Sequence, residues 1–134
     1  MGLDIYFFAN ENDDRILALS EEDYEPDASI DIEVGYFRKV NTLIQWAESH
    51  IGPVKNCKKI PLMQAHLLAL RRDLEALTPE NCMTQFPTVS GFFFGSTAYD
   101  EMYWSDVDEI KGWLDTILNT FDFELNTLFF WAWW

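Results

Sequence analysis

The stretch Leu128-Phe129-Phe130-Trp131-Ala132-Trp133-Trp134 decides the predicted fold. Aromatic residues at this density are typical of a β-strand, because large rings pack well on a pleated surface. A segment this apolar would aggregate if it were left exposed. We therefore expect it to form a strand that pairs with a second strand and is covered by helices on one face.

The pairing partner is predicted at residues 3–9, near the opposite end of the chain. Leu3, Ile5 and Phe7 occupy every second position there, and a period of two places all three on one face of a strand. The Asn- and Asp-rich residues 10–14 predict a turn, and residues 15–20 predict a short strand that completes a hairpin. Residues 21–31 are expected to form a polar, acidic loop that contains Pro26.

Three helices are predicted from apolar residues spaced three and four apart. The first covers Gly35–Ser49 and ends before Gly52-Pro53. The second follows a basic loop at residues 54–60 and starts at Pro61, because proline suits a first helical position. It carries the apolar row Met63, Leu67, Leu70, Leu74 and Leu77.

The third helix is predicted at Tyr99–Phe121, after a loop at residues 80–90. Ser105 with Asp108 three residues later resembles a capping box, so this helix could also begin at Ser105. The aromatic segment Gly91–Ser96 fits either a short buried strand or a tight loop. Together these elements predict an α+β fold, in which a small antiparallel sheet with the N- and C-terminal strands packs against about three helices.

Composition limits the class of protein. The chain has 134 residues, of which 49% are hydrophobic and 24% charged, so we expect a single domain covering residues 1–134. No apolar run reaches the ~18 residues that span a bilayer, and no basic segment precedes an apolar one as in a secretory signal. With only two cysteines and no such signal, we expect reduced thiols and a cytoplasmic location.

Charge is unevenly distributed along the sequence. The formal net charge of −14 divides into −10 for residues 1–33, +6 for residues 34–72 and −10 for residues 73–134. So acidic a chain repels phosphate backbones, which disfavours direct nucleic-acid binding. The basic middle third either pairs with the acidic segments inside the fold or forms a local anion site.

No motif predicts a metal or a cofactor. His50, Cys57, His66 and Cys82 are spaced too widely for a zinc site, where at least two ligands are usually two to four residues apart. Five acidic residues cluster near the predicted start of the third helix, namely Asp100, Glu101, Asp106, Asp108 and Glu109. Their carboxylates could bind magnesium. However, the helix dipole also favours acidic residues in a first helical turn.

One candidate site joins two polar segments. Arg38, Lys39 and Asn41 are predicted on one helix, where they could hold an anion. Residues near the start of the third helix could line the same site and move a proton. The candidate site residues are Arg38, Lys39, Asn41, Ser96, Thr97, Tyr99, Asp100 and Tyr103.

Four sequence segments carry a resemblance to a known family. They are Met1-Gly2-Leu3-Asp4-Ile5-Tyr6, then Gly35-Tyr36-Phe37-Arg38-Lys39-Val40-Asn41 with Trp46, then Asn56-Cys57, and Ser90-Gly91-Phe92-Phe93-Phe94-Gly95-Ser96 with Tyr99-Asp100-Glu101 and Tyr103. The chain resembles a family of small uncharacterised proteins of bacteriophages, prophages and bacteria, with the motifs MGLDxY, YWRKxN and GFFFGSxxYDExY. Phe37 stands where the family has Trp, and Ile44 stands where many members have His, so any chemistry of that His is absent here.

Two functional hypotheses follow. The resemblance and the acidity favour a non-enzymatic phage or prophage accessory protein that binds a protein partner as monomer or homodimer, and that could mimic nucleic acid toward a host factor. The alternative is a small ligand-binding protein or enzyme with an anion site near Arg38 and Asp100.

Overall fold

The computed structural model describes residues 2–11, 24–91 and 93–134. The strands are β1 (Asp4–Glu11), β2 (Ile32–Arg38), β3 (Lys59–Leu62) and β4 (Asn126–Trp133). The helices are α2 (Asn41–His50), α3 (Gln64–Glu75), the short α4 (Cys82–Gln85) and α5 (Glu101–Thr120). The strand expected at residues 15–20 lies outside the described residues.

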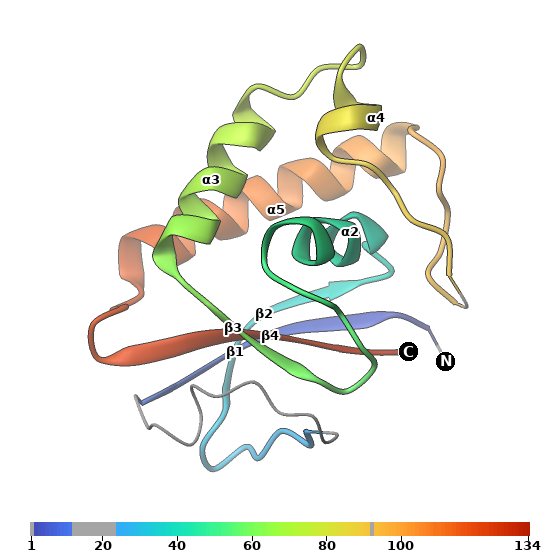
Figure 1. Cartoon of the computed structure of the whole chain (residues 1–134). Helices are drawn as coiled ribbons and strands as arrows, with labels where there is room; N and C mark the ends of the chain where they lie inside the picture. The colour runs from blue at the N-terminus through green and yellow to red at the C-terminus, as the bar shows by residue number, and fades with distance from the viewer. Residues whose placement is uncertain (1, 12–23, 92) are drawn as a thin grey trace.

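The strands form one antiparallel sheet in the order β2-β1-β4-β3. The strands from the two ends of the chain lie side by side at its centre, with Ile5 opposite Ala132 and Phe7 opposite Phe130. Figure 1 shows the helices on one side of this sheet and residues 24–31 on the other. The predicted α+β fold and the predicted pairing of the two terminal strands are therefore confirmed.

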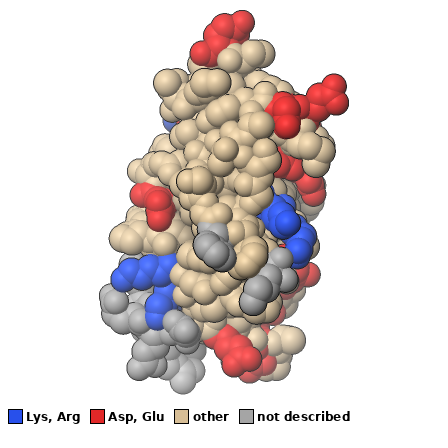
Figure 2. Space-filling view, turned by 90° about the vertical axis from the view of Figure 1, so that its right-hand side faces the viewer, with Lys and Arg blue, Asp and Glu red and all other residues tan. Residues whose placement is uncertain are grey.

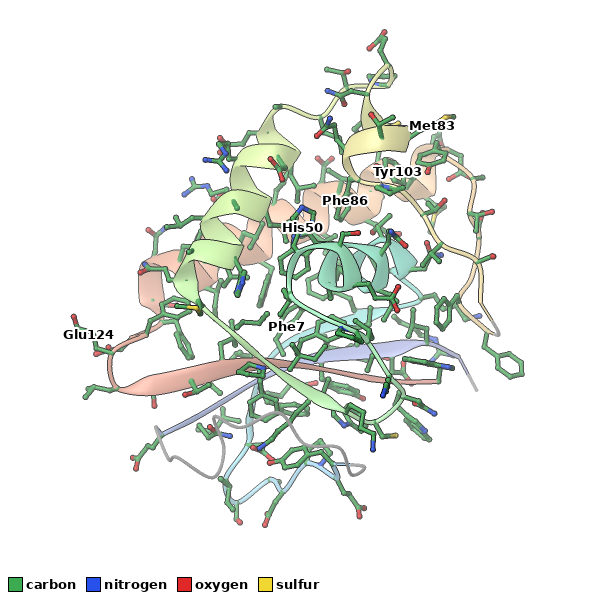
Figure 3. The ribbon with its side chains drawn as sticks, in the orientation of Figure 1. Phe7, His50, Met83, Phe86, Tyr103 and Glu124 are labelled. Carbon is green, nitrogen blue, oxygen red and sulfur yellow. The ribbon has the colours of Figure 1, made fainter. Side chains whose placement is uncertain are left out.

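The main core lies between the sheet and the helices. Phe7 contacts Phe37, Trp113 and Phe130 there, with ring centroids 4.3–6.0 Å apart, and Figure 3 shows it directed toward the helix layer. Burying one such ring stabilises the fold by about 2 kcal/mol. Leu67, Leu70 and Leu74 of the row predicted for α3 are buried in the same core, whereas Met63 is exposed. The buried side chains of α5 are Tyr103, Val107, Ile110, Leu114 and Ile117.

The opposite face of the sheet carries a second aromatic cluster. Phe8, Phe129 and Trp131 are buried there, and Tyr24 packs against them. Asp31 is also buried, and its carboxylate accepts hydrogen bonds from Asn10 Nδ2 (2.7 Å), the Tyr24 hydroxyl (2.6 Å) and the Asp27 amide (2.8 Å). The loop at residues 24–31 is thus anchored to the sheet through one acidic side chain.

The predicted helix over Gly35–Ser49 is wrong in its first half. Residues 32–38 form β2, in which Tyr36 pairs with Tyr6 and Phe37 with Ile5, and α2 begins only at Asn41. Phe37 and Val40 are buried on the helix side of the sheet, so their spacing matches a helix although Phe37 belongs to a strand. The first two residues of the turn predicted at 10–14 belong instead to β1, which extends to Glu11, and residues 12–14 lie outside the described residues.

The loop predicted at residues 54–60 is confirmed for residues 54–58 and wrong for the last two. The helical start predicted at Pro61 is wrong. Lys59–Leu62 form β3, in which Pro61 lies opposite Phe129. This strand is at the edge of the sheet, where proline is tolerated because half of the backbone groups need no partner. The helix that follows, α3, begins at Gln64.

The alternative prediction that the third helix begins at Ser105 is wrong. The helix begins at Glu101 and its N-cap is Asp100, whose carboxylate accepts from the amides of Met102 and Tyr103. Ser105 is therefore inside the helix. The described residues of Gly91–Ser96 form a loop, and the loop predicted at residues 80–90 contains the one-turn helix α4. No helix in the described ranges has the length and hydropathy needed to cross a membrane.

Candidate functional site

A cavity of about 300 Å³ opens where β2 meets α2. One wall comes from this junction and contains Arg38, Lys39, Asn41 and Thr42. The opposite wall comes from the loop before α5 and from its first turns, and includes Gly95, Ser96, Asp100, Tyr103 and Asp106. Figure 2 shows the side of the molecule where α5 begins, with basic groups next to acidic ones near its right-hand edge.

The cavity unites most of the site predicted from sequence. Six of the eight candidates line it, namely Arg38, Lys39, Asn41, Ser96, Asp100 and Tyr103. Thr97 and Tyr99 do not line it. The Thr97 carbonyl accepts from Thr88 Oγ1, and the Tyr99 hydroxyl accepts from the Thr88 amide. The prediction that Arg38 and Asn41 share a helix is wrong, since Arg38 ends β2 and Asn41 begins α2.

Lys39 makes the sharp turn between strand and helix. Its backbone is in the left-handed region, with φ of 58°, which costs a non-glycine residue about 1–2 kcal/mol. Its amide donates to the Leu3 carbonyl at 2.7 Å, and this bond fixes the turn to the start of β1. Gly95, with φ of 89°, packs against the Lys39 side chain so closely that a Cβ there would lie 3.0 Å from Lys39 Cβ.

Asn41 holds the two walls together. Its Nδ2 donates to the carbonyls of Phe94 (3.1 Å) and Ser96 (2.9 Å), and its Oδ1 accepts from the Val89 amide (3.1 Å). The side chain is 2% exposed. Both amide hydrogens are thus used within the protein. Asn41 therefore positions the wall of the cavity, and the prediction that it holds an anion is wrong.

The side chains predicted to move a proton have structural partners. The Tyr103 hydroxyl donates to the Phe86 carbonyl at 2.8 Å, and Figure 3 shows Tyr103 beside Phe86. Burial, with smaller contributions from Cys82 and Tyr99, raises the pKa of Tyr103 well above its ordinary value. Asp100 caps α5 with one carboxylate oxygen, which explains its position at the helix start.

The basic side of the cavity holds two cations of different character. Arg38 Nη1 lies 3.1 Å from Asp4 Oδ1, and the Tyr36 hydroxyl donates to the same oxygen at 2.6 Å. Tyr36 first, and Asp4 second, raise the pKa of Arg38. Lys39 is exposed and forms no ion pair with any described residue, so its charge remains available at the mouth of the cavity.

Sequence reasoning missed Thr42, which lines the cavity and carries a buried hydroxyl. Thr42 is 5% exposed, and its Oγ1 has no hydrogen-bond partner in the described part of the chain. It belongs to the first turn of α2, which has neither a capping side chain nor an acidic residue. A helix start in this state presents unpaired amides and a partial positive charge. No motif in the sequence signals this group.

Asp106 is the second group whose role the sequence did not reveal, because an acid near a helix start is ordinarily explained by the helix dipole. It is partly buried, and its side chain makes no hydrogen bond within the described residues. Burial raises the pKa of its carboxyl, and the nearby Glu109 and Asp100 raise it further. The structure therefore places a partly buried acid in the cavity that contains Lys39.

The four residues whose spacing argues against a zinc site include two histidines. The rings of His50 and His66 bond to backbone atoms of their own helices or caps. Among residues 2–11, 24–91 and 93–134 no group of three His, Cys, Asp or Glu side chains could hold a metal ion.

Comparison with known proteins adds no assignment. No protein-family model matches the chain, and searches of curated proteins and of solved structures find no similar protein. The function therefore has to be inferred from the cavity itself.

Proposed function

We propose that the protein binds a small molecule through an anionic group, such as a phosphate, in the cavity between β2–α2 and the start of α5. The observation that carries this proposal is the buried hydroxyl of Thr42, which has no partner among the described residues and lies in the first turn of an uncapped helix. A buried polar group without a partner costs about 1–3 kcal/mol. An anion at this helix start would accept from the hydroxyl and from first-turn amides other than that of Leu43, which donates to the Val40 carbonyl at 3.1 Å.

The surrounding charges support the same ligand. Lys39 and Arg38 line the cavity next to the helix start, and the helix N-terminus itself acts as about half a positive charge. Tyr103 and Asp100 are engaged in hydrogen bonds inside the protein, which favours binding over proton transfer at this site.

Titration with inorganic phosphate, followed by amide NMR spectra, tests the proposal. We expect saturable shifts at Asn41, Thr42 and Gly95, with a Kd of about 1 mM. Lys39→Gln should weaken binding about threefold or more. Arg72→Gln is the matched control, because Arg72 is exposed on α3 and does not line the cavity. Absence of saturable shifts, or equal effects of both variants, would contradict the proposal.

Protein binding by nucleic-acid mimicry is the second candidate and remains a prediction, together with a phage or prophage origin and a cytoplasmic location. The acids exposed along α5 favour it, because Glu101, Asp108 and Asp115 recur every seventh residue. Their spacing along the helix is about 10 Å, against one phosphate per 3.4 Å of a DNA strand. On the side of the molecule where α5 begins, Figure 2 shows acidic groups separated by uncharged surface. Mimicry therefore ranks below ligand binding.

Salt dependence distinguishes this candidate. A mimic that captures a nucleic-acid-binding protein should lose it as salt rises, because contacts between exposed charges are screened over about 10 Å at 0.1 M salt. Capture that is insensitive to salt would count against mimicry.

A further inference from the structure

We infer that the ligand carries an ammonium group in addition to its anionic group, so that it is a small zwitterion. This inference rests on the proposed function and specifies the ligand class of the same cavity. The observation behind it is that Lys39 and Asp106 line one cavity of about 300 Å³, and that neither forms an ion pair with a described residue.

A ligand with negative charge alone does not suit this cavity. Asp106 and Asp100 both line it, and like charges at this range disfavour each other. Asp100 is partly compensated, because its carboxylate accepts two amides at the start of α5. Asp106 lies more than one turn further along the helix and has no such donor. Its negative charge would therefore repel a ligand that carries only negative charge.

An ammonium group resolves the conflict. It would donate to the Asp106 carboxylate, which is partly buried and has no hydrogen-bond donor among the described residues. Such a charge-assisted bond is about twice as strong as a neutral one. The anionic end would meanwhile occupy the start of α2, near Thr42 and Lys39. The cavity volume restricts the molecule to a compact one in which a short linker separates the two charges.

A matched pair of probes isolates the ammonium group. Phosphoethanolamine and ethyl phosphate share the phosphate monoester and the two-carbon chain, and differ in the terminal amine. Calorimetric titration of the whole chain should give a Kd for phosphoethanolamine about tenfold lower than for ethyl phosphate. In Asp106→Asn this preference should fall to about twofold or less, while ethyl phosphate should bind as well as, or better than, to the unmodified chain.

Asp108→Asn is the control, because Asp108 is exposed on the same helix and does not line the cavity. It should keep the full preference for phosphoethanolamine. Thermal melting of both variants checks that they fold, and Asp106→Glu, which retains the carboxylate, should keep part of the preference.

The outcomes separate this inference from the proposed function. Equal affinity for the two probes, or a preference that survives in Asp106→Asn, would overturn the zwitterion while leaving the anion site in place. If neither probe binds and phosphate produces no shifts at Thr42, the proposed function itself fails.

Discussion

Thr42 and Asp106 line the same cavity. The Thr42 hydroxyl is buried without a partner in the described part of the chain, and the partly buried Asp106 carboxylate makes no hydrogen bond within it. Buried polar groups in folded proteins are nearly always paired, so such exceptions call for a physical explanation. Asn41, Asp100 and Tyr103 lie beside them but are bonded to backbone atoms. At the residue scale, the site therefore divides into groups that build the cavity and groups left for a ligand.

Thr42→Val tests the first of these two groups. Valine has nearly the same shape but no hydroxyl, so it removes a buried oxygen whose burial costs about 1–3 kcal/mol. We expect the variant to be more stable by about 1 kcal/mol in urea unfolding and to bind phosphate more weakly. A variant that is destabilised, or that binds phosphate unchanged, would show that the hydroxyl has a partner inside the protein.

Asp106→Asn tests the second group through pH. Burial raises the pKa of Asp106 in the folded state above its ordinary value, so the folded state favours the protonated carboxyl. The stabilising contribution is full below the ordinary pKa of an aspartate and is lost as pH rises through the raised pKa. The asparagine variant should therefore gain thermal stability relative to the unmodified chain on going from acidic to neutral pH. A stability difference that does not change with pH would contradict the raised pKa.

At the element scale, the edge strand β2 determines where the cavity forms. It ends in Arg38 and turns sharply at Lys39 into α2. Its register against β1 shifts between Phe7 and Phe8. In this region Trp113 of α5 donates from Nε1 to the Val34 carbonyl at 2.8 Å. The indole thus covers part of an otherwise open sheet edge and fixes α5 relative to β2, which sets the distance between the two walls of the cavity.

Gly35→Ala tests this attachment. A Cβ at Gly35 would lie 2.6 Å from Trp113 Nε1 and 2.9 Å from Cε2, so the indole would have to move. We expect a loss of about 1–3 kcal/mol in the free energy of unfolding and a change in tryptophan fluorescence. Gly112→Ala is the matched control, because a Cβ there meets no atom within 4 Å. Equal stability of the two variants would contradict the packing of Trp113 on β2.

The elements that sequence predicts well are those in which periodicity and burial coincide. The alternation of Leu3, Ile5 and Phe7 and the aromatic C-terminal stretch predict β1 and β4, and the row from Leu67 to Leu74 predicts α3. β2 and β3 escape prediction for physical reasons. Phe37 lies in β2, but its distance of three residues from Val40 also matches the period of a helix. Pro61 lies in the edge strand β3, although proline ordinarily suits the start of a helix.

The candidate site is predictable in its location and not in its chemistry. Charge and residue type are enough to suggest that one site contains Arg38, Lys39, Ser96 and Asp100. The hydrogen bonds of these and neighbouring residues depend on the folded backbone. The sequence cannot show that Asn41 and Tyr103 are already bonded, or that the hydroxyl of Thr42 is not.

At the scale of the whole molecule, the net charge of −14 opposes the binding of anions. An anion can bind only where local cations and the start of a helix outweigh this charge. The pairing of β1 with β4 brings the start of the chain against Lys39, because the Leu3 carbonyl accepts the Lys39 amide. The cavity therefore depends on the closure of the sheet by its two terminal strands. A zwitterionic ligand would approach this acidic protein with less repulsion than a simple anion.

An experimental structure of the protein with phosphoethanolamine is the most direct test of the anion site. We predict the phosphate at the start of α2, within hydrogen-bond distance of Thr42 Oγ1 and near Lys39 Nζ, and the ammonium group at the Asp106 carboxylate. A structure in which phosphoethanolamine is bound elsewhere, or in which this cavity stays empty at saturating concentration, would contradict it.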